Sequence, residues 1–292
     1  MIGMGSSIFH PEASRIVYLA SAGKKGIAQS IFQLGGNSGS ALAPLLAALI
    51  IMPYGQANIK WFCLAGLIGI LVMNSIVKWY RKNANTTLSN KIVIKDGVQV
   101  KLSKKRILYS LSVLLLLIFS KYFYLACINN YYTFFLIDKF HMSVQQSQIY
   151  LFIFLGSSAA GTLIGGPLGD RFGRKYIIWI SILGITPFTL LLPYASLFWT
   201  LAFSIIIGVI LSSAFSAILN FAVDLVPHKL GLISGLFFGF AFGMAGLGSA
   251  VLGKIADMTS VSFVFEICSF LPLIGIFTVF LPDLKQLKMS SK

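Results

Sequence analysis

Nine long apolar segments follow one another along this chain, and they constrain its fold more than any other feature. Most are close to the ~20 residues that an α-helix needs to cross a bilayer, and the longer segment 107–137 must tilt, kink or project beyond it. Their continuous apolar character predicts helices rather than the short alternating strands of a membrane barrel. Charged residues make up 11% of the chain, against about 25% in soluble domains. We therefore expect an all-α membrane protein. The predicted spans are residues 1–20, 27–50, 58–79, 107–137, 147–169, 176–195, 197–223, 231–255 and 262–281.

Basic residues divide the connections between these spans into two alternating sets. The connections at 21–26, 78–106, 171–175 and 228–230, with the tail after 282, hold 18 of the 23 Lys and Arg. Because basic loops of membrane proteins stay in the cytoplasm, we predict that the C-terminus is cytoplasmic. This rule also accounts for the net charge of +15, so no nucleic-acid partner is expected. We expect the lipid bilayer to surround the predicted spans.

A short repeat suggests that the chain is built in two parts. The sequence GIAQS at 26–30 follows Lys24, and the similar GLISG at 231–235 follows Lys229. Both segments open spans that are rich in small residues. We predict a first part of three spans over 1–79, a basic cytoplasmic linker over 80–106 and a second part of six spans over 107–292.

Residues 161–175 read GTLIGGPLGDRFGRK and lie on a turn between two predicted spans. This pattern resembles the G-x-x-x-D-R-x-G-R-[RK] loop of the major facilitator superfamily of transporters. FHPEASR at 9–15, QSIFQLGGN at 29–37, KYFY at 121–124 and SGLFFGFAFGM at 234–244 further resemble the bacterial fosmidomycin-resistance exporters of that superfamily. The resemblance implies a facilitator-type helical bundle and proton-driven drug efflux. The family plan has twelve transmembrane helices, whereas about nine are predicted in this chain, with only three of them before the basic linker. We therefore expect counterparts of the family's first three spans to be absent.

The charged loop of this pattern is the predicted gate. Asp170 is expected to accept hydrogen bonds from the N-terminus of an adjacent helix, or from Arg, in one conformation and to release them in the other. A charge cluster that only fixes topology is the alternative. The predicted gating residues are Gly165, Asp170, Arg171, Gly173, Arg174 and Asp224.

The first predicted span carries the candidate proton-coupling residues. Glu12 and Arg15 are three residues apart, so they lie on one helix face and can form an ion pair. His10 stands two residues before Glu12 and would influence its protonation. A purely structural ion pair is the alternative interpretation.

Lys121 is the main candidate for binding substrate, because an ionisable group inside a membrane span is costly and usually functional. A lysine with aromatic and amide neighbours would attract an anionic phosphonate, although its ammonium group could also reach the interface or pair with a carboxylate. Gln33 and Asn37 are more readily explained as contacts between helices, and Asn220 ends a span. The predicted substrate-binding residues are Lys121, Tyr124, Asn129, Asn130, Tyr132, Asn37, Gln33 and Asn220.

Glycines at intervals of four predict faces where helices approach closely. We expect Gly35 and Gly39 in the first part, with Gly161 and Gly165 in the second, to serve contacts between the two parts. Residues 235–243 make a third such face.

Together these features predict a proton-coupled exporter of a small anionic drug such as fosmidomycin, in the bacterial inner membrane. No cofactor or metal is expected, because the three histidines are not clustered with cysteines or acidic residues. The alternatives are a truncated, non-transporting remnant and a membrane-embedded enzyme that uses His10 and Glu12.

Overall fold

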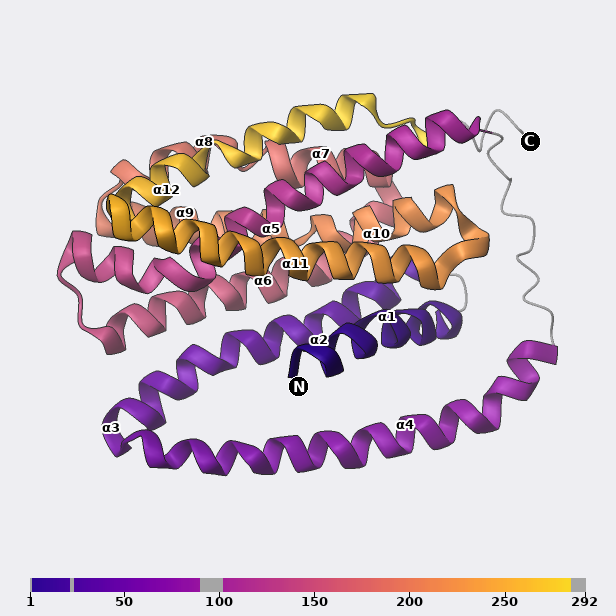
Figure 1. Ribbon diagram of the computed structural model, residues 1–292, viewed down its shortest axis with the longest axis horizontal. Coiled ribbons are helices and arrows are strands. Elements are labelled where there is room, and N and C mark those ends of the chain that lie inside the picture. The colour runs from indigo at the N-terminus through magenta and orange to yellow at the C-terminus, as the bar shows by residue number, and fades with distance from the viewer. Residues whose placement is uncertain (1, 22–23, 90–101, 285–292) are drawn as a thin grey trace.

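The computed structural model describes residues 2–21, 24–89 and 102–284, which are helical or lie in short connections, with no strand among them. The helices run along one common axis (Figure 1). Among the described residues, eight helical segments are long and apolar enough to cross a membrane. The all-α prediction is confirmed. The predicted count of nine differs by one, because α1 (Ile2–Ala20) is a helix of 19 residues that does not reach the same hydropathy.

The N-terminal part of the bundle holds the first four α-helices. Their bounds are α1 (Ile2–Ala20), α2 (Lys25–Leu46), the π-helical turn η1 (Ala47–Ile51), α3 (Met52–Tyr54), the 3₁₀ segment η2 (Gln56–Phe62) and α4 (Cys63–Ser89). The last of these runs ten residues into the predicted linker. The remainder of that linker lies largely outside the described residues.

The C-terminal part contains the remaining helices and the buried residues of both apolar core clusters. Their bounds are α5 (Lys104–Phe140), α6 (Val144–Phe172), α7 (Arg174–Leu183), α8 (Thr186–Leu191), η3 (Leu192–Tyr194), α9 (Leu197–Ser212), α10 (Ala214–Leu225), η4 (Pro227–Lys229), α11 (Leu230–Met258), α12 (Val261–Ser269) and η5 (Leu271–Phe280). Each of the six predicted spans of this part corresponds to one, two or three of these helices.

Local sequence signals fix the ends of α6, the helix that leads to the charged loop. Ser143 and Gln146 form a capping box, in which each side chain accepts a hydrogen bond from the other residue's backbone amide. The helix ends at Gly173, whose φ of 106° is disfavoured for residues with a Cβ. This glycine lets the chain turn directly into α7.

Two apolar clusters make up the core, and α5 contributes to both. Its first half packs against α11, η5 and α10, and Leu114, Ile118 and Phe237 are fully buried in this cluster. Its second half packs against α6, α9 and α12, with Phe135 and Phe154 fully buried. Helix α5 therefore connects the two core clusters of the C-terminal part.

Helix α12 gives way to the 3₁₀ segment η5 near Pro272, which cannot donate a backbone hydrogen bond. Hydroxyl groups from neighbouring helices satisfy the carbonyl groups at this junction. Ser120 Oγ donates to the carbonyl of Leu271 at 2.6 Å, and Thr189 Oγ1 donates to that of Ser269 at 2.9 Å. Such compensation is required where no water reaches the backbone.

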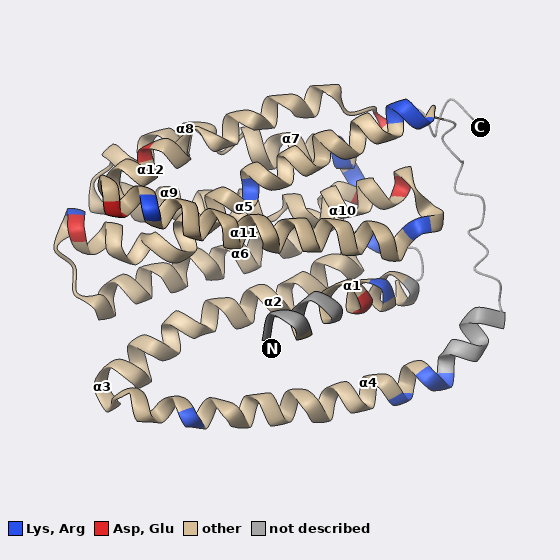
Figure 2. Ribbon diagram, in the orientation of Figure 1, with Lys and Arg blue, Asp and Glu red and all other residues tan. Residues whose placement is uncertain are grey.

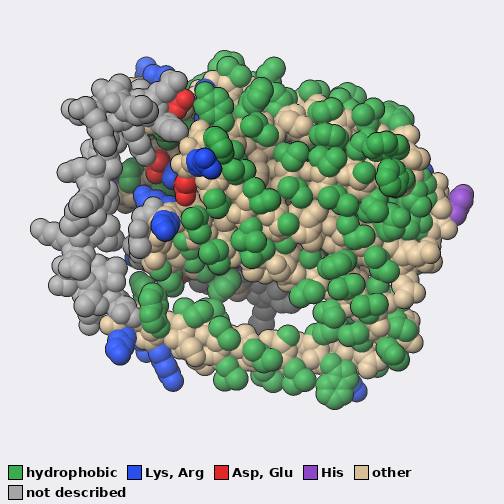
Figure 3. Space-filling model, turned by 180° about the vertical axis from the view of Figure 1, so that it is seen from behind, with side chains coloured by type: hydrophobic (Ala, Val, Ile, Leu, Met, Phe, Trp, Pro, Cys, Tyr) green, Lys and Arg blue, Asp and Glu red, His purple; other side chains and the backbone are tan. Residues whose placement is uncertain are grey.

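Helix α4 stands apart from the rest of the bundle. Every side chain from 63 to 79 is exposed, and Figure 3 shows open space between this helix and the main body. The same view shows apolar side chains over most of the surface, as expected for a protein surrounded by lipid.

The N-terminal and C-terminal parts meet chiefly where α2 runs antiparallel to α6, while α1 packs against α11. The predicted glycine contacts between the parts differ from the observed ones. Gly161 and Gly165 face Val209 and Ser213 of the C-terminal part itself, whereas a Cβ at Gly35 or Gly39 would meet nothing within 4 Å. The close approach between the parts is made instead by two glycines that were not singled out, at positions 26 and 166.

Candidate functional site

A cavity lies between the two parts of the bundle and is lined by both. We call it the Lys121 cavity. Its lining includes polar residues of α2, α5 and α6 together with aromatic residues of α10 and α11. The lining residues are His10, Gln33, Gly36, Asn37, Ser40, Lys121, Tyr122, Leu125, Asn129, Leu155, Ser158, Thr162, Ser212, Phe215, Phe238 and Phe242.

Lys121 contributes its amino group to the lining of this cavity. It comes from the middle of α5 and is only 4% exposed. Its Nζ lies 5.7 Å from the ring centroid of Tyr122 and 5.6 Å from that of Phe215, so it makes cation–π contacts. It forms no ion pair or hydrogen bond with any residue that the structure describes. A buried ammonium group without a counter-ion costs on the order of several kcal/mol, and an anion in the cavity would lower this cost.

His10 brings α1 to the same cavity. Its ring lies 4.9 Å from the ring centroid of Phe242 and 5.7 Å from that of Phe238, both on α11. Its ring centroid also lies 6.4 Å from that of Phe32 on α2. The imidazole is thus held by aromatic rings from both parts of the bundle.

Uncharged polar groups complete the polar lining. The Gln33 Nε2 and Ser158 Oγ atoms are buried and have no hydrogen-bond partner among the described residues. Asn37 is already engaged, since its Nδ2 donates to Thr162 Oγ1 at 2.7 Å across the α2–α6 contact. The cavity therefore offers unused donors from α2 and α6 beside the ammonium group of α5.

The structure places four of the eight predicted substrate-binding residues in this cavity, namely Lys121, Asn129, Gln33 and Asn37. The other four have different environments.

Tyr132 packs between the rings of α6 and α12, and its hydroxyl lies 2.8 Å from Ser204 Oγ. Tyr124 belongs to the same buried cluster. Asn130 Nδ2 donates to Ser249 Oγ at 2.9 Å, so it ties α5 to α11. Asn220 lies in the charged network described below.

The predicted ion pair on α1 is present but lies outside the cavity lining. Arg15 Nη1 is 3.1 Å from Glu12 Oε1, and their side chains are 45% and 49% exposed. Of the three predicted proton-coupling residues, only His10 reaches the cavity. Within the described ranges, no three His, Cys, Asp or Glu side chains come together as a metal site would require.

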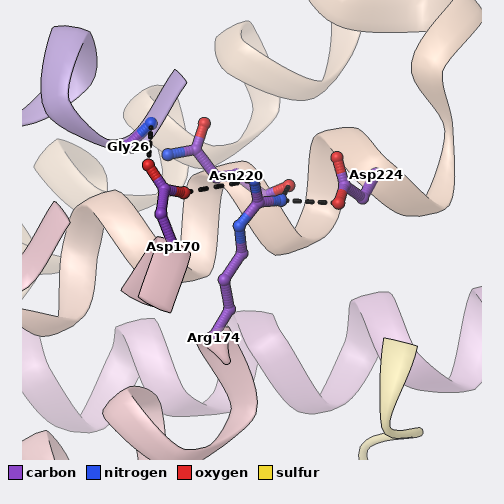
Figure 4. Close-up of polar contacts among 5 residues, drawn as sticks. All are labelled: Gly26, Asp170, Arg174, Asn220 and Asp224. Atoms are coloured by element: carbon purple, nitrogen blue, oxygen red, sulfur yellow. Dashed lines mark hydrogen bonds and ion pairs between the residues drawn. The ribbon is translucent and has the colours of Figure 1, made fainter. Parts of the chain in front are cut away.

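Asp170, Arg174 and Asp224 form a connected network, which we call the α6–α7 charge cluster (Figure 4). Asp170 Oδ2 accepts a hydrogen bond from the backbone amide of Gly26 at 3.1 Å, at the N-terminus of α2. Arg174 Nη1 lies 2.7 Å from Asp224 Oδ2 and donates to the carbonyl of Asn220 at 2.6 Å. Arg174 Nη2 lies 3.8 Å from Asp170 Oδ1. The cluster thus ties α6, α7 and α10 to the start of α2.

The remaining residues of the predicted gate have separate contacts. Gly165 packs closely against Ser213, Gly173 makes the turn, and Arg171 is exposed with its guanidinium over the Phe172 ring. Lys175 was not predicted to have a role of its own. Its Nζ donates to the carbonyls of Val279, at 3.0 Å, and Leu281, so it binds the end of η5.

Charge is concentrated at the ends of the bundle, and most of the basic segments lie at the end where α4 finishes and α5 begins (Figure 2). The α6–α7 charge cluster belongs to this end. The arrangement matches the alternation of basic loops along the sequence, and the long middle of the bundle is largely free of charge.

Comparison with known proteins identifies the family. The sequence profile of the Major Facilitator Superfamily matches residues 114–291. The fosmidomycin resistance protein of Escherichia coli (strain K12) is 57% identical over 283 residues, covering 97% of this chain and 69% of that protein. The chain belongs to the Major Facilitator Superfamily. The resemblance to the superfamily is therefore confirmed, and the chain is a multi-pass membrane transporter of small molecules.

Other members of the superfamily show related similarity. An uncharacterized MFS-type transporter, YfnC, of Bacillus subtilis (strain 168) is 40% identical over 292 residues, covering 98% of this chain and 70% of the relative. A probable sugar efflux transporter of Helicobacter pylori (strain G27) is 26% identical over 260 residues, covering 86% of this chain and 62% of the relative.

Proposed function

We propose that this facilitator exports a small anionic drug such as fosmidomycin from the cytoplasm, across the bacterial inner membrane and in exchange for protons. The observation that carries the proposal is Lys121, a buried ammonium group that faces a cavity and has no counter-ion among the described residues. The name of the 57% identical Escherichia coli relative supports the choice of fosmidomycin as the first compound to test.

In this proposal the substrate anion pairs with Lys121, while amide and hydroxyl groups bind its polar atoms. Gln33 on α2 and Asn129 on α5 approach the cavity from the two parts of the bundle. Asn37 becomes available when its bond to Thr162 opens. A substrate that contacts both parts at once stabilises the conformation in which they lie together.

The α6–α7 charge cluster supports a role as the cytoplasmic gate. It joins the two parts at the end that collects most of the basic segments, which the positive-inside rule assigns to the cytoplasm together with the C-terminus. Release of the Gly26 amide by Asp170 would free the start of α2 from α6. Separation of α2 from α6 at this end would give a path from the cytoplasm toward the cavity.

Proton exchange is assigned to α1. His10 lies in the cavity, and the Glu12–Arg15 ion pair follows it on the same helix. Protonation of Glu12 would release Arg15 and change the charge beside the α1–α2 connection. In this scheme His10 exchanges protons with the cavity and Glu12 exchanges them nearer the helix end.

Drug resistance of cells tests the proposal. The chain is expressed in a fosmidomycin-sensitive bacterium beside two lysine variants, and the inhibitory drug concentration is measured at matched protein levels. Lys121→Met is expected to lose resistance, whereas Lys254→Met, which alters an exposed lysine on α11, is expected to keep it. Resistance that is unchanged in Lys121→Met would refute the assigned anion site. No resistance from the unaltered chain would favour the non-transporting alternative.

A further inference from the structure

Helices α2 and α6 are joined by a hydrogen bond at the end of the bundle away from the α6–α7 charge cluster. Gln145, in the first turn of α6, donates from Nε2 to the carbonyl of Ala48 at 3.2 Å. Ala48 belongs to the π-helical turn η1, which continues α2. Figure 1 shows α3, which follows this turn, at the end opposite to the one where α4 finishes. The basic connections predict that this is the outer end.

The Ala48 carbonyl depends on a donor from outside its own helix. The residue is 0% exposed. In the π-helical turn the amide of Met52 donates to the carbonyl of Ala47 rather than to that of Ala48. With the same i→i+5 spacing, the donor for Ala48 would be residue 53, which is a proline and has no amide hydrogen. A buried carbonyl without a donor is costly, so Gln145 satisfies a group that the helix itself leaves open.

The Lys121 cavity lies between the two ends of this helix pair. Its lining residues from α2 fall within 33–40, and those from α6 fall within 155–162. On both helices these ranges lie between the Asp170 contact at one end and the Gln145 contact at the other. The nearest lining position is about 10–15 Å along the helix from either contact. The two contacts are therefore placed to act on opposite sides of a ligand.

We propose that Gln145 and the Ala48 carbonyl form an outer latch, which holds α2 to α6 on the outer side and is released when the cavity opens outward. The inference rests on the transport cycle of the proposed function, but not on its cargo or its protons. Gln145 is a positioning residue, since it lies outside the cavity lining. It is exposed, so water can replace its partner when the helices separate. A single uncharged hydrogen bond changes an equilibrium by a factor of about 2–10, which suits a contact that opens in every cycle.

Labelling of a buried cysteine measures the latch without any drug. Ala41 lies on α2 between the cavity and the latch and is 3% exposed. Ala41→Cys is introduced into a chain whose 3 native cysteines are replaced by serine, and an impermeant thiol reagent is added to intact cells. Gln145→Glu removes the donor at nearly unchanged size and should speed labelling by about 2–10-fold. A carboxylate in the first turn also suits the dipole of α6, so the variant is expected to fold.

Pro53→Ala tests whether the acceptor is the carbonyl that the proline leaves open. The new amide at residue 53 can serve Ala48 in the π-helical spacing, so the effect of Gln145→Glu on labelling should fall to within about twofold in this background. A glutamine with only a general structural role would have the same effect in both backgrounds. Gln56→Ala, at an exposed glutamine of η2, is the control and should label as the unaltered background does.

The outcomes separate the latch from the export function. Labelling that is no faster in Gln145→Glu would overturn the outer latch, and so would equal acceleration in Gln56→Ala, which would mean general loosening. An undiminished effect of Gln145→Glu in the Pro53→Ala background would overturn the Ala48 carbonyl as the acceptor. Absence of drug resistance from the unaltered chain would overturn the proposed export function, whereas the labelling result would still decide the latch.

Discussion

The backbone amide of Gly26 donates to the Asp170 carboxylate at 3.1 Å, although 144 residues separate the two positions. The contact places a carboxylate at the N-terminus of α2, where unpaired amide groups and the helix dipole both favour negative charge. It also joins the N-terminal part of the bundle to the loop between α6 and α7. One hydrogen bond thus connects a helix end to the charge cluster around Arg174.

Replacing Asp170 by Asn should weaken the contact between α2 and α6 while keeping the size of the side chain. A carboxylate at a helix N-terminus contributes about 0.3–1 kcal/mol when exposed, and the Asp170 side chain is 34% exposed. We expect a few-fold shift toward the conformation in which α2 and α6 separate at this end. Labelling of a cysteine introduced at Ser30, which is buried beside Ser216, should become faster. Asp257→Asn, at an exposed carboxylate, is the control, and equal labelling in both variants would contradict the proposed latch.

Gly26 and Gly231 occupy matching places in the sequence repeat, and the structure predicts opposite responses to alanine. A Cβ at Gly26 would lie 2.7 Å from Asp170 Oδ1, whereas a Cβ at Gly231 would meet nothing within 4 Å. Gly26→Ala should therefore displace the Asp170 carboxylate, weaken its hydrogen bond to the amide of residue 26 and reduce transport. Gly231→Ala should leave transport near that of the unaltered chain. Drug efflux by both variants is measured at matched expression. Equal loss of efflux in the two variants would show that the glycines matter as helix ends and that the contact between residue 26 and Asp170 does not explain the effect.

Arg174 should be needed for folding as well as gating. Its side chain is 16% exposed and that of Asp224 is 12% exposed, so Arg174→Met removes the guanidinium that lies 2.7 Å from a largely buried carboxylate. Breaking a fully buried pair costs about 3–5 kcal/mol, and the residual exposure lowers this figure. We expect a lower melting temperature in detergent and less protein in the membrane. Adding Asp224→Asn should recover part of the loss, and a double variant no more stable than the single one would argue against the pair.

The sequence predicted the helices well because their signals are local. Long apolar runs fix the spans, and the Ser143 capping box with Gly173 fixes the limits of α6 within a few residues. The contact between α2 and α6 was predicted less well. Glycine spacing indicates a face that can approach another helix but not which helix it meets, so Gly161 and Gly165 contact their own part instead of α2.

Half of the predicted substrate-binding residues lie in the cavity, and the difference has a geometric cause. Tyr132 lies eleven residues beyond Lys121, or about 16 Å along the helix. On an isolated helix the two side chains point in similar directions. At the level of Tyr132, helices α6, α9 and α12 pack around α5, so the ring of Tyr132 is part of the core. Helical periodicity gives the direction of a side chain, whereas the neighbours at each level depend on the tertiary fold.

The α1 ion pair allows the proton-coupling assignment to be tested against a structural one. Glu12→Gln is expected to abolish uphill export with little change in stability, because an exposed pair contributes about 0.2–1 kcal/mol. If the pair is only structural, Glu12→Gln combined with Arg15→Gln should restore export. Efflux against a concentration gradient in the double variant decides between these outcomes, with counterflow as the measure of intact substrate binding.

The orientation of the bundle can be tested at its two ends. The basic connections predict that Ser89, at the end of α4, faces the cytoplasm and that Thr259, after α11, faces outward. Single cysteines at these positions are introduced into a chain whose Cys63, Cys127 and Cys268 are replaced by serine. An impermeant thiol reagent should label the Thr259→Cys variant in intact cells and the Ser89→Cys variant only after the membrane is opened. The reverse pattern would invert the bundle, and the α6–α7 charge cluster would then gate the outer side.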